Sequence, residues 1–131
     1  MPHTITARID KTNYSTQIQY ANHQLWADEP KDLGGQDTGF APMELLLASL
    51  AACSGITLRM YAERKQWQLE AVELELSLDR DSTLAVTHIV RKVRFIGNLS
   101  EEQRQRLLQI ANQCPVHKTL TNPIQIETME Y

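Results

Sequence analysis

Two cysteines, Cys53 and Cys114, are the residues of this sequence with the most distinctive chemistry. A thiolate is a nucleophile that can be oxidised reversibly, and two thiols that meet can form a disulfide. Cys53 lies in an apolar segment, where a lone cysteine is most often a buried core residue. Cys114 directly precedes Pro115, so we expect it at a helix N-terminus, where unpaired backbone N–H groups favour a thiolate. The two are therefore either inert buried residues or a redox pair.

His117 and Lys118 follow Cys114 within about one helical turn. His117 could act as a base or a hydrogen-bond partner for a thiol, and Lys118 would add positive charge. Each could equally be an exposed helix residue. A Cys–His hydrolase or transferase that uses Cys53 with His117 is one reading of these residues. No metal site is expected, because the sequence has no CxxC or HxxxH pattern and only His117 lies near a cysteine.

The composition indicates one ordinary globular domain over residues 1–131, with 42% hydrophobic and 22% charged residues. A net charge of -3 argues against nucleic acid as the main partner. We expect no signal peptide and no membrane span, because no uninterrupted apolar run approaches about 20 residues. The protein is therefore predicted to be cytoplasmic. That compartment keeps thiols reduced, so a purely structural disulfide is a poor explanation of the cysteines.

Alternating apolar and polar residues predict a three-stranded meander before the first cysteine. The strands are expected at residues 4–9, 17–20 and 23–27, with a hairpin turn at residues 10–13. A loop of about 15 residues, dense in Asp, Gly and Pro, follows the third strand. Such a loop is long enough to have a function or to contact a partner.

The segment that begins at Pro42 and contains Cys53 predicts a helix of about 20 residues, because Pro favours a first helical position and Ala and Leu favour the interior. The helix is apolar on nearly every side, which is typical of a central, buried helix. One chain of this length supplies little cover for it, so we expect a homodimer. Gly55 inside the helix predicts either a close approach by another backbone or a kink.

The second half of the chain predicts an antiparallel strand pair, at residues 69–78 and 88–96, joined through residues 79–83. Ser100 and Gln103 form a capping-box pattern ahead of a helix over residues 104–112. A short helix begins at Pro115, and a final alternating strand is expected at residues 124–129. These elements predict an α+β fold with antiparallel strands around a long central buried helix.

Two segments resemble the cysteine motifs of the OsmC/Ohr family of osmotically inducible and organic hydroperoxide resistance proteins. Residues 39–53, GFAPMELLLASLAAC, are similar to the family segment that leads through a proline into the central helix and ends at the reactive cysteine. Residues 114–118, CPVHK, are similar to the second cysteine motif. The order of the expected elements resembles the family over essentially the whole chain, most closely its OsmC-like branch.

The resemblance implies a thiol peroxidase for organic hydroperoxides that acts in oxidative-stress defence as an intertwined homodimer, with its active sites at the subunit interface. It assigns Cys53 as the peroxidatic thiol, which becomes a sulfenic acid, and Cys114 as the resolving thiol, which closes a disulfide. An external dithiol would reduce that disulfide, and no cofactor is implied. The alternative is a non-catalytic OsmC-like protein that binds a small apolar ligand in the same pocket.

One family feature is different here. Family peroxidases have a glutamate directly after the proline, and it positions an arginine that activates the thiolate, whereas this chain has Met43. Glu44 is adjacent, but on a helix it is rotated by about 180° from Cys53 and lies ~13 Å away along the axis. Only a second subunit or an irregular first turn would bring Glu44 to Cys53. In the family the matching arginine lies in the region of the N-terminal strand, and here both Arg8 and Lys11 are near that region without a clear match, with Arg8 as a possible supporting residue.

Overall fold

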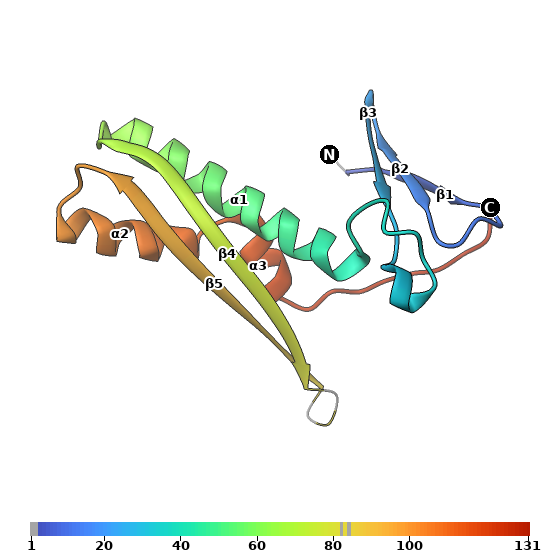
Figure 1. The fold of residues 1–131 in the computed structure, drawn as a ribbon. Coiled ribbons are helices and arrows are strands. Elements are labelled where there is room, and N and C mark those ends of the chain that lie inside the picture. Colours follow the sequence, from blue (N-terminus) through green and yellow to red (C-terminus); the bar gives the residue numbers. More distant parts are fainter. Residues whose placement is uncertain (1–2, 82, 84) are drawn as a thin grey trace. The chain divides into compact units, whose positions relative to one another are not determined.

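The computed structural model of the protein describes residues 3–81, 83 and 85–131. The chain divides into two compact units, Met1–Leu46 and Leu47–Tyr131. The first unit contains the predicted meander: β1 (Thr6–Ile9), β2 (Thr16–Tyr20) and β3 (His23–Ala27) form an antiparallel sheet in that order (Figure 1). In its register, Ile18 of β2 lies opposite both Ala7 and Leu25. The three predicted strands are therefore confirmed, with β1 beginning at Thr6.

Asp28 organises the loop that follows β3. Its buried carboxylate accepts the Thr38 hydroxyl at 2.6 Å, together with several backbone N–H groups of the loop and of Tyr14. The Thr38 hydroxyl in particular, and then these N–H groups, hold the pKa of Asp28 below its ordinary value. A short 3₁₀ helix, η1 (Lys31–Leu33), lies within the loop. A Cβ on Gly39 would lie 2.0 Å from the Trp26 carbonyl oxygen, so only glycine fits there.

The cysteine-bearing helix α1 (Pro42–Lys65) is a continuous helix of 24 residues. Its buried side chains are Leu50, Ser54, Leu58, Tyr61 and Ala62, which recur at helical spacing along one face. In one chain, α1 is therefore buried along one face only. Other apolar side chains of the helix are exposed, because the described elements of the second unit cover only that face.

Two further properties of α1 bear on the sequence predictions. An added Cβ on Gly55 would meet the Leu74 side chain at 3.5 Å, an ordinary contact, so the expected close approach by another backbone is wrong for the described residues of one chain. By length and composition alone, α1 could cross a membrane, a property that it shares with the core helices of soluble proteins.

The second unit contains a long antiparallel hairpin, β4 (Leu69–Asp81) and β5 (Val86–Gly97). Side chains alternate as predicted, with those at Val72, Leu74, Leu76 and Leu78 half-buried on the inner face. The predicted turn is partly wrong, because residues 79–81 still pair with β5; residues 82 and 84 lie outside the described part of the chain. The hairpin packs against α1 and α2 through a buried cluster made by Leu58, Tyr61, Ala62, Leu69, Phe95, Leu107, Ile110 and Ala111.

Helix α2 (Glu101–Ala111) begins with the predicted capping box, in which Ser100 Oγ accepts the Gln103 N–H at 3.1 Å and the Gln103 side chain accepts the Ser100 N–H. Helix α3 (Pro115–Thr121) follows, with Cys114 as its N-cap residue. The final strand predicted at residues 124–129 is wrong: residues 123–131 have no regular secondary structure. Alternation alone does not make a strand, which also needs a neighbouring backbone to pair with, and Ile126 is 84% exposed.

Candidate functional site

Cys53 lies on α1, half-buried, at the wall of a cavity of about 850 Å³ in the second unit. The cavity is mainly apolar around the thiol, with two guanidinium groups from different helices, those of Arg64 and Arg106. Its lining residues are Cys53, Ile56, Thr57, Met60, Tyr61, Arg64, Arg106, Ile110, Gln113 and Pro115. A thiol in this position is accessible to a small molecule with an apolar body.

Cys114 is fully buried, and both cysteines are free thiols. Its sulfur accepts the backbone N–H of His117 at 3.3 Å and lies 4.0 Å from Ser54 Oγ. Ser54 directly follows Cys53, while Pro115, which directly follows Cys114, lines the Cys53 cavity. The fold therefore brings the two cysteine segments together, while the disulfide between them stays a prediction.

The ring of His117 contacts Arg91 rather than a thiol. His117 Nδ1 lies 3.2 Å from Arg91 Nη2. Because a guanidinium can only donate, Nδ1 is the acceptor and the proton of the neutral ring is on Nε2. Burial first, and the charge of Arg91 second, lower the pKa of His117. Nδ1 is thus not free to take a proton from Cys114, and the contact of His117 with that sulfur comes from its backbone.

Arg91 is a site residue that the sequence analysis missed. Its Nη1 donates to Ser54 Oγ at 2.9 Å, and its Nη2 donates to Asn112 Oδ1 at 2.9 Å. The signal that could have revealed it is its position in the alternation of β5, between Ile89 and Val93, where an inward-facing apolar residue is expected. A charge on the inner face of a strand indicates a polar partner across the interior.

The remaining predicted site residues are in different places. Glu44, in the first turn of α1, and Arg8, on β1, are exposed residues of the first unit, whereas both cysteines belong to the second. Lys118 is exposed on α3. Met43 is 39% exposed. Supporting roles for Glu44 and Arg8 therefore stay predictions.

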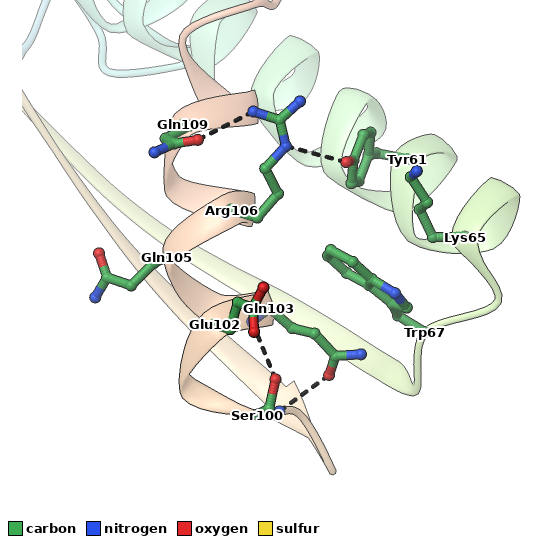
Figure 2. Close-up of a pocket in the computed structure, with 9 residues that line it drawn as sticks. All are labelled: Tyr61, Lys65, Trp67, Ser100, Glu102, Gln103, Gln105, Arg106 and Gln109. Carbon is green, nitrogen blue, oxygen red and sulfur yellow. Dashed lines mark hydrogen bonds between the residues drawn. The ribbon is translucent and has the colours of Figure 1, made fainter.

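A second, more polar cavity of about 720 Å³ lies between α1 and α2 (Figure 2). Arg106 reaches across from α2 and donates from Nε to the Tyr61 hydroxyl at 3.1 Å, as Figure 2 shows. That hydrogen bond, and the charges of Arg106, Lys65 and Arg64, lower the pKa of Tyr61 against the effect of burial. Ser100 and Gln103, which also line it, are occupied by the helix cap. The cavity contains neither thiol, so it is not the candidate redox site.

Among the described residues, no three His, Cys, Asp or Glu side chains are arranged to hold a metal ion. The chemistry that the described groups support is that of thiols. The half-buried thiol of Cys53 lines a mainly apolar cavity, and the buried thiol of Cys114 contacts Ser54, whose hydroxyl also binds Arg91.

Comparison with protein families matches residues 35–129 to the family described as OsmC-like protein. Comparison with curated proteins found no match. Among solved structures, the OsmC-like protein of Mycoplasma pneumoniae is similar to this chain, with 24% identity and a TM-score of 0.78; the match covers 92% of this chain and 87% of that one.

Two similar structures have names that refer to peroxides. An organic hydroperoxide resistance protein OsmC from Legionella pneumophila has 21% identity and a TM-score of 0.67, over 92% of this chain and 90% of that one. The organic hydroperoxide resistance protein OhrB of Bacillus subtilis has 23% identity and a TM-score of 0.63, over 92% of this chain and 91% of that one. At these identities the likeness establishes the fold, which is the predicted α+β fold of OsmC/Ohr proteins.

Proposed function

Because the chain belongs to the OsmC-like protein family, we propose that it reduces organic hydroperoxides with its two cysteines, in defence against oxidative stress. The names of the similar proteins from Legionella pneumophila and Bacillus subtilis support this theme. The observation that carries the proposal is the arrangement of the thiols. Cys53 lines an apolar cavity that also includes Pro115, and Ser54, the neighbour of Cys53, contacts Cys114.

In the first step, the Cys53 thiolate attacks one peroxide oxygen and the O–O bond breaks. Cys53 becomes a sulfenic acid, and the leaving alkoxide takes a proton to give the alcohol. In the second step, the Cys114 thiolate attacks the Cys53 sulfur, the S–O bond breaks, and hydroxide leaves as water after protonation. An external dithiol then supplies two electrons and two protons and restores both thiols. The reaction needs no cofactor.

The cavity lining favours an organic peroxide over hydrogen peroxide. Ile56, Met60 and Ile110 provide apolar contact for an alkyl or aryl group beside Cys53. Such a group would displace poorly held water, which favours binding. The physiological peroxide and dithiol would be identified by comparing the rates at which candidate peroxides oxidise the protein and candidate dithiols reduce it again.

A second copy of the chain supplies the missing cover for α1 in this proposal. Ile56 is 55% exposed and Met60 is 65% exposed, although both belong to an apolar helix. A self-complementary apolar face is what a twofold homodimer buries. We infer a soluble, cytoplasmic homodimer, intertwined as the family resemblance implies, in which Glu44 of one copy would approach the site of the other.

The test is oxidation of the reduced protein by cumene hydroperoxide. Wild type should form a Cys53–Cys114 disulfide, seen on a gel without reductant, and consume one peroxide per disulfide. Cys114→Ser should stop at a sulfenic acid on Cys53 that dimedone traps, and Cys53→Ser should form neither product. If wild type and Cys53→Ser consume peroxide equally slowly, the peroxidase proposal is wrong.

A second candidate function is the binding of a small apolar ligand without catalysis, which Met43 favours. Methionine stands where family peroxidases have the glutamate that positions an activating arginine, and it fills irregular apolar space well. This function predicts that an environment-sensitive apolar dye binds at the Cys53 cavity and that Met60→Gln weakens its binding. The dye should bind equally well to Cys53→Ser, because no thiol chemistry is involved.

A further inference from the structure

Arg91 differs from the other cations of its strand. Lys92 and Arg94, on the outer face of β5, form ion pairs with Glu75 and Glu73 of β4, at 3.6 and 3.1 Å. None of the ion pairs between described residues involves Arg91. Its guanidinium is therefore an inward-facing charge without a carboxylate partner in the described part of the chain.

Three neutral acceptors hold this guanidinium in place. They are Ser54 Oγ on α1, Asn112 Oδ1 at the end of α2 and His117 Nδ1 on α3. The Ser54 hydroxyl hydrogen is directed at the Leu50 carbonyl, 2.6 Å away, so Ser54 acts only as an acceptor toward Arg91. The charge is thus fixed by the hydrogen bonds that it donates to neutral acceptors on three segments, and it is not neutralised. Such a site favours an anion.

Cys114 is the group beside this charge that can become an anion. Ser54 Oγ contacts both Arg91 Nη1, at 2.9 Å, and Cys114 Sγ, at 4.0 Å. The guanidinium therefore lies no more than about 7 Å from the sulfur, a distance at which charges in a protein interior still interact appreciably. Because Cys114 is fully buried, water would not stabilise a thiolate there, and the His117 N–H and a fixed cation nearby would do so instead.

We propose that Arg91 is a positioning residue for the resolving step: its charge, held by Ser54, Asn112 and His117, favours the Cys114 thiolate and speeds its attack on oxidised Cys53. The proposal rests on the proposed function. In that step the S–S bond forms, the bond from the Cys53 sulfur to its leaving group breaks, and the leaving group departs with the electron pair. Arg91 acts on the second thiol and leaves the first step unchanged.

The step can be measured without any peroxide. The aromatic disulfide DTNB converts the more accessible thiol, Cys53, to a mixed disulfide and releases one thionitrobenzoate anion. Attack by Cys114 then forms the Cys53–Cys114 disulfide and releases the second anion, whose absorbance gives the rate of closure. DTNB is the oxidant, so atoms and electrons balance, and the result does not depend on whether the protein is a peroxidase. Mass spectrometry of the Cys114→Ser protein locates the first adduct.

Arg91→Met should slow the release of the second anion at neutral pH by about tenfold or more, because the attacking thiolate loses its cation. The rate of disulfide closure in Arg91→Met should recover as the pH is raised, since hydroxide then generates the Cys114 thiolate. Arg91→Lys should restore most of the neutral-pH rate, because it keeps the charge. The matched control is Arg94→Met, which removes an outer-face cation of the same strand and should close at the wild-type rate.

Three results would overturn the proposal. One is closure by Arg91→Met at the wild-type rate. Another is equal slowing in the Met and Lys variants at every pH, which would mean that Arg91 acts through packing alone. The third is a slower first step with cumene hydroperoxide in Arg91→Met, measured by dimedone trapping in a Cys114→Ser background. If wild type closes the disulfide with DTNB but does not react with peroxide, the proposed function fails and the role of Arg91 stands.

Discussion

Ser54 Oγ lies 4.0 Å from Cys114 Sγ, and both side chains are fully buried. The two residues are 60 positions apart in the sequence. Ser54 directly follows Cys53 on α1, and Cys114 is the N-cap residue of α3. This contact therefore joins the helix that carries one thiol to the residue that carries the other, and Arg91 reinforces it from β5.

Ser54→Ala should lower the free energy of unfolding by about 1–2 kcal/mol, because Arg91 loses one of its acceptors in a partly buried site. Urea denaturation followed by circular dichroism measures the change. Ser77→Ala, at an exposed position on β4, is the control and should stay within about 0.5 kcal/mol of wild type. An unchanged stability in Ser54→Ala would mean that the hydrogen bond from Arg91 contributes nothing to the fold.

His117 should make the protein less stable as the pH falls below neutral. Its folded-state pKa is lowered, so the unfolded chain binds the proton more readily. The free energy of unfolding is then highest above the unfolded pKa of about 6.5 and declines as the pH falls toward the folded value. Urea denaturation at a series of pH values measures this decline.

His117→Gln is the comparison for this pH dependence. It removes the titrating group but keeps a side chain that can accept from Arg91, so its profile should be flatter than that of wild type between pH 7 and the acidic range. Asp28 is present in both proteins, and its own stabilisation begins to be lost only as the pH falls to its ordinary pKa of about 3.8. Parallel profiles for the two proteins would contradict the assignment of His117.

Gly55→Ala should raise the free energy of unfolding by roughly 0.5–1 kcal/mol. Alanine favours a helix interior, and its Cβ would meet only the Leu74 side chain, at 3.5 Å, among the described residues. Thermal and urea denaturation measure the gain. A loss of stability together with a changed oligomeric state would instead show that another chain packs against Gly55.

Met60→Glu should shift the protein from dimer toward monomer in sedimentation velocity. Met60 is 65% exposed on α1, and a second copy that buries this face would have to bury the new charge. The loss of affinity should reach at least tenfold at micromolar protein concentration, in line with the cost of a buried unpaired charge. A wild-type protein that sediments as a stable monomer would contradict the homodimer itself.

Met43→Glu should raise the rate at which Cys53 reacts with an organic hydroperoxide. The new carboxylate restores the group that, in the family resemblance, holds a cation near the thiolate. Stopped-flow measurement with cumene hydroperoxide gives the rate, and Met43→Gln is the uncharged control. If Glu44 of the other subunit already holds that cation, Glu44→Gln should lower the reaction rate of Cys53, and Met43→Glu should raise it only a little.

Features that depend on near neighbours in the chain could be predicted from the sequence. The meander strands, the capping box at Ser100 and the helix that begins at Pro115 were all predicted, because periodicity and helix caps involve residues a few positions apart. The two cysteine motifs identified the family in the same way, as short ordered segments. The sequence by itself therefore determined the fold class and the candidate thiols.

The partners of those thiols were decided only by the tertiary structure. Arg91 contacts Ser54 and His117, which are 37 and 26 positions away in the sequence. No local sequence pattern predicts which side chains the fold brings together over such separations. The strand expected at residues 124–129 failed for the same reason, since pairing depends on where another backbone lies. The exposed face of α1 is a third case. The apolar composition of a helix indicates that its surface favours burial. The packing of the whole chain determines which part of that surface is covered.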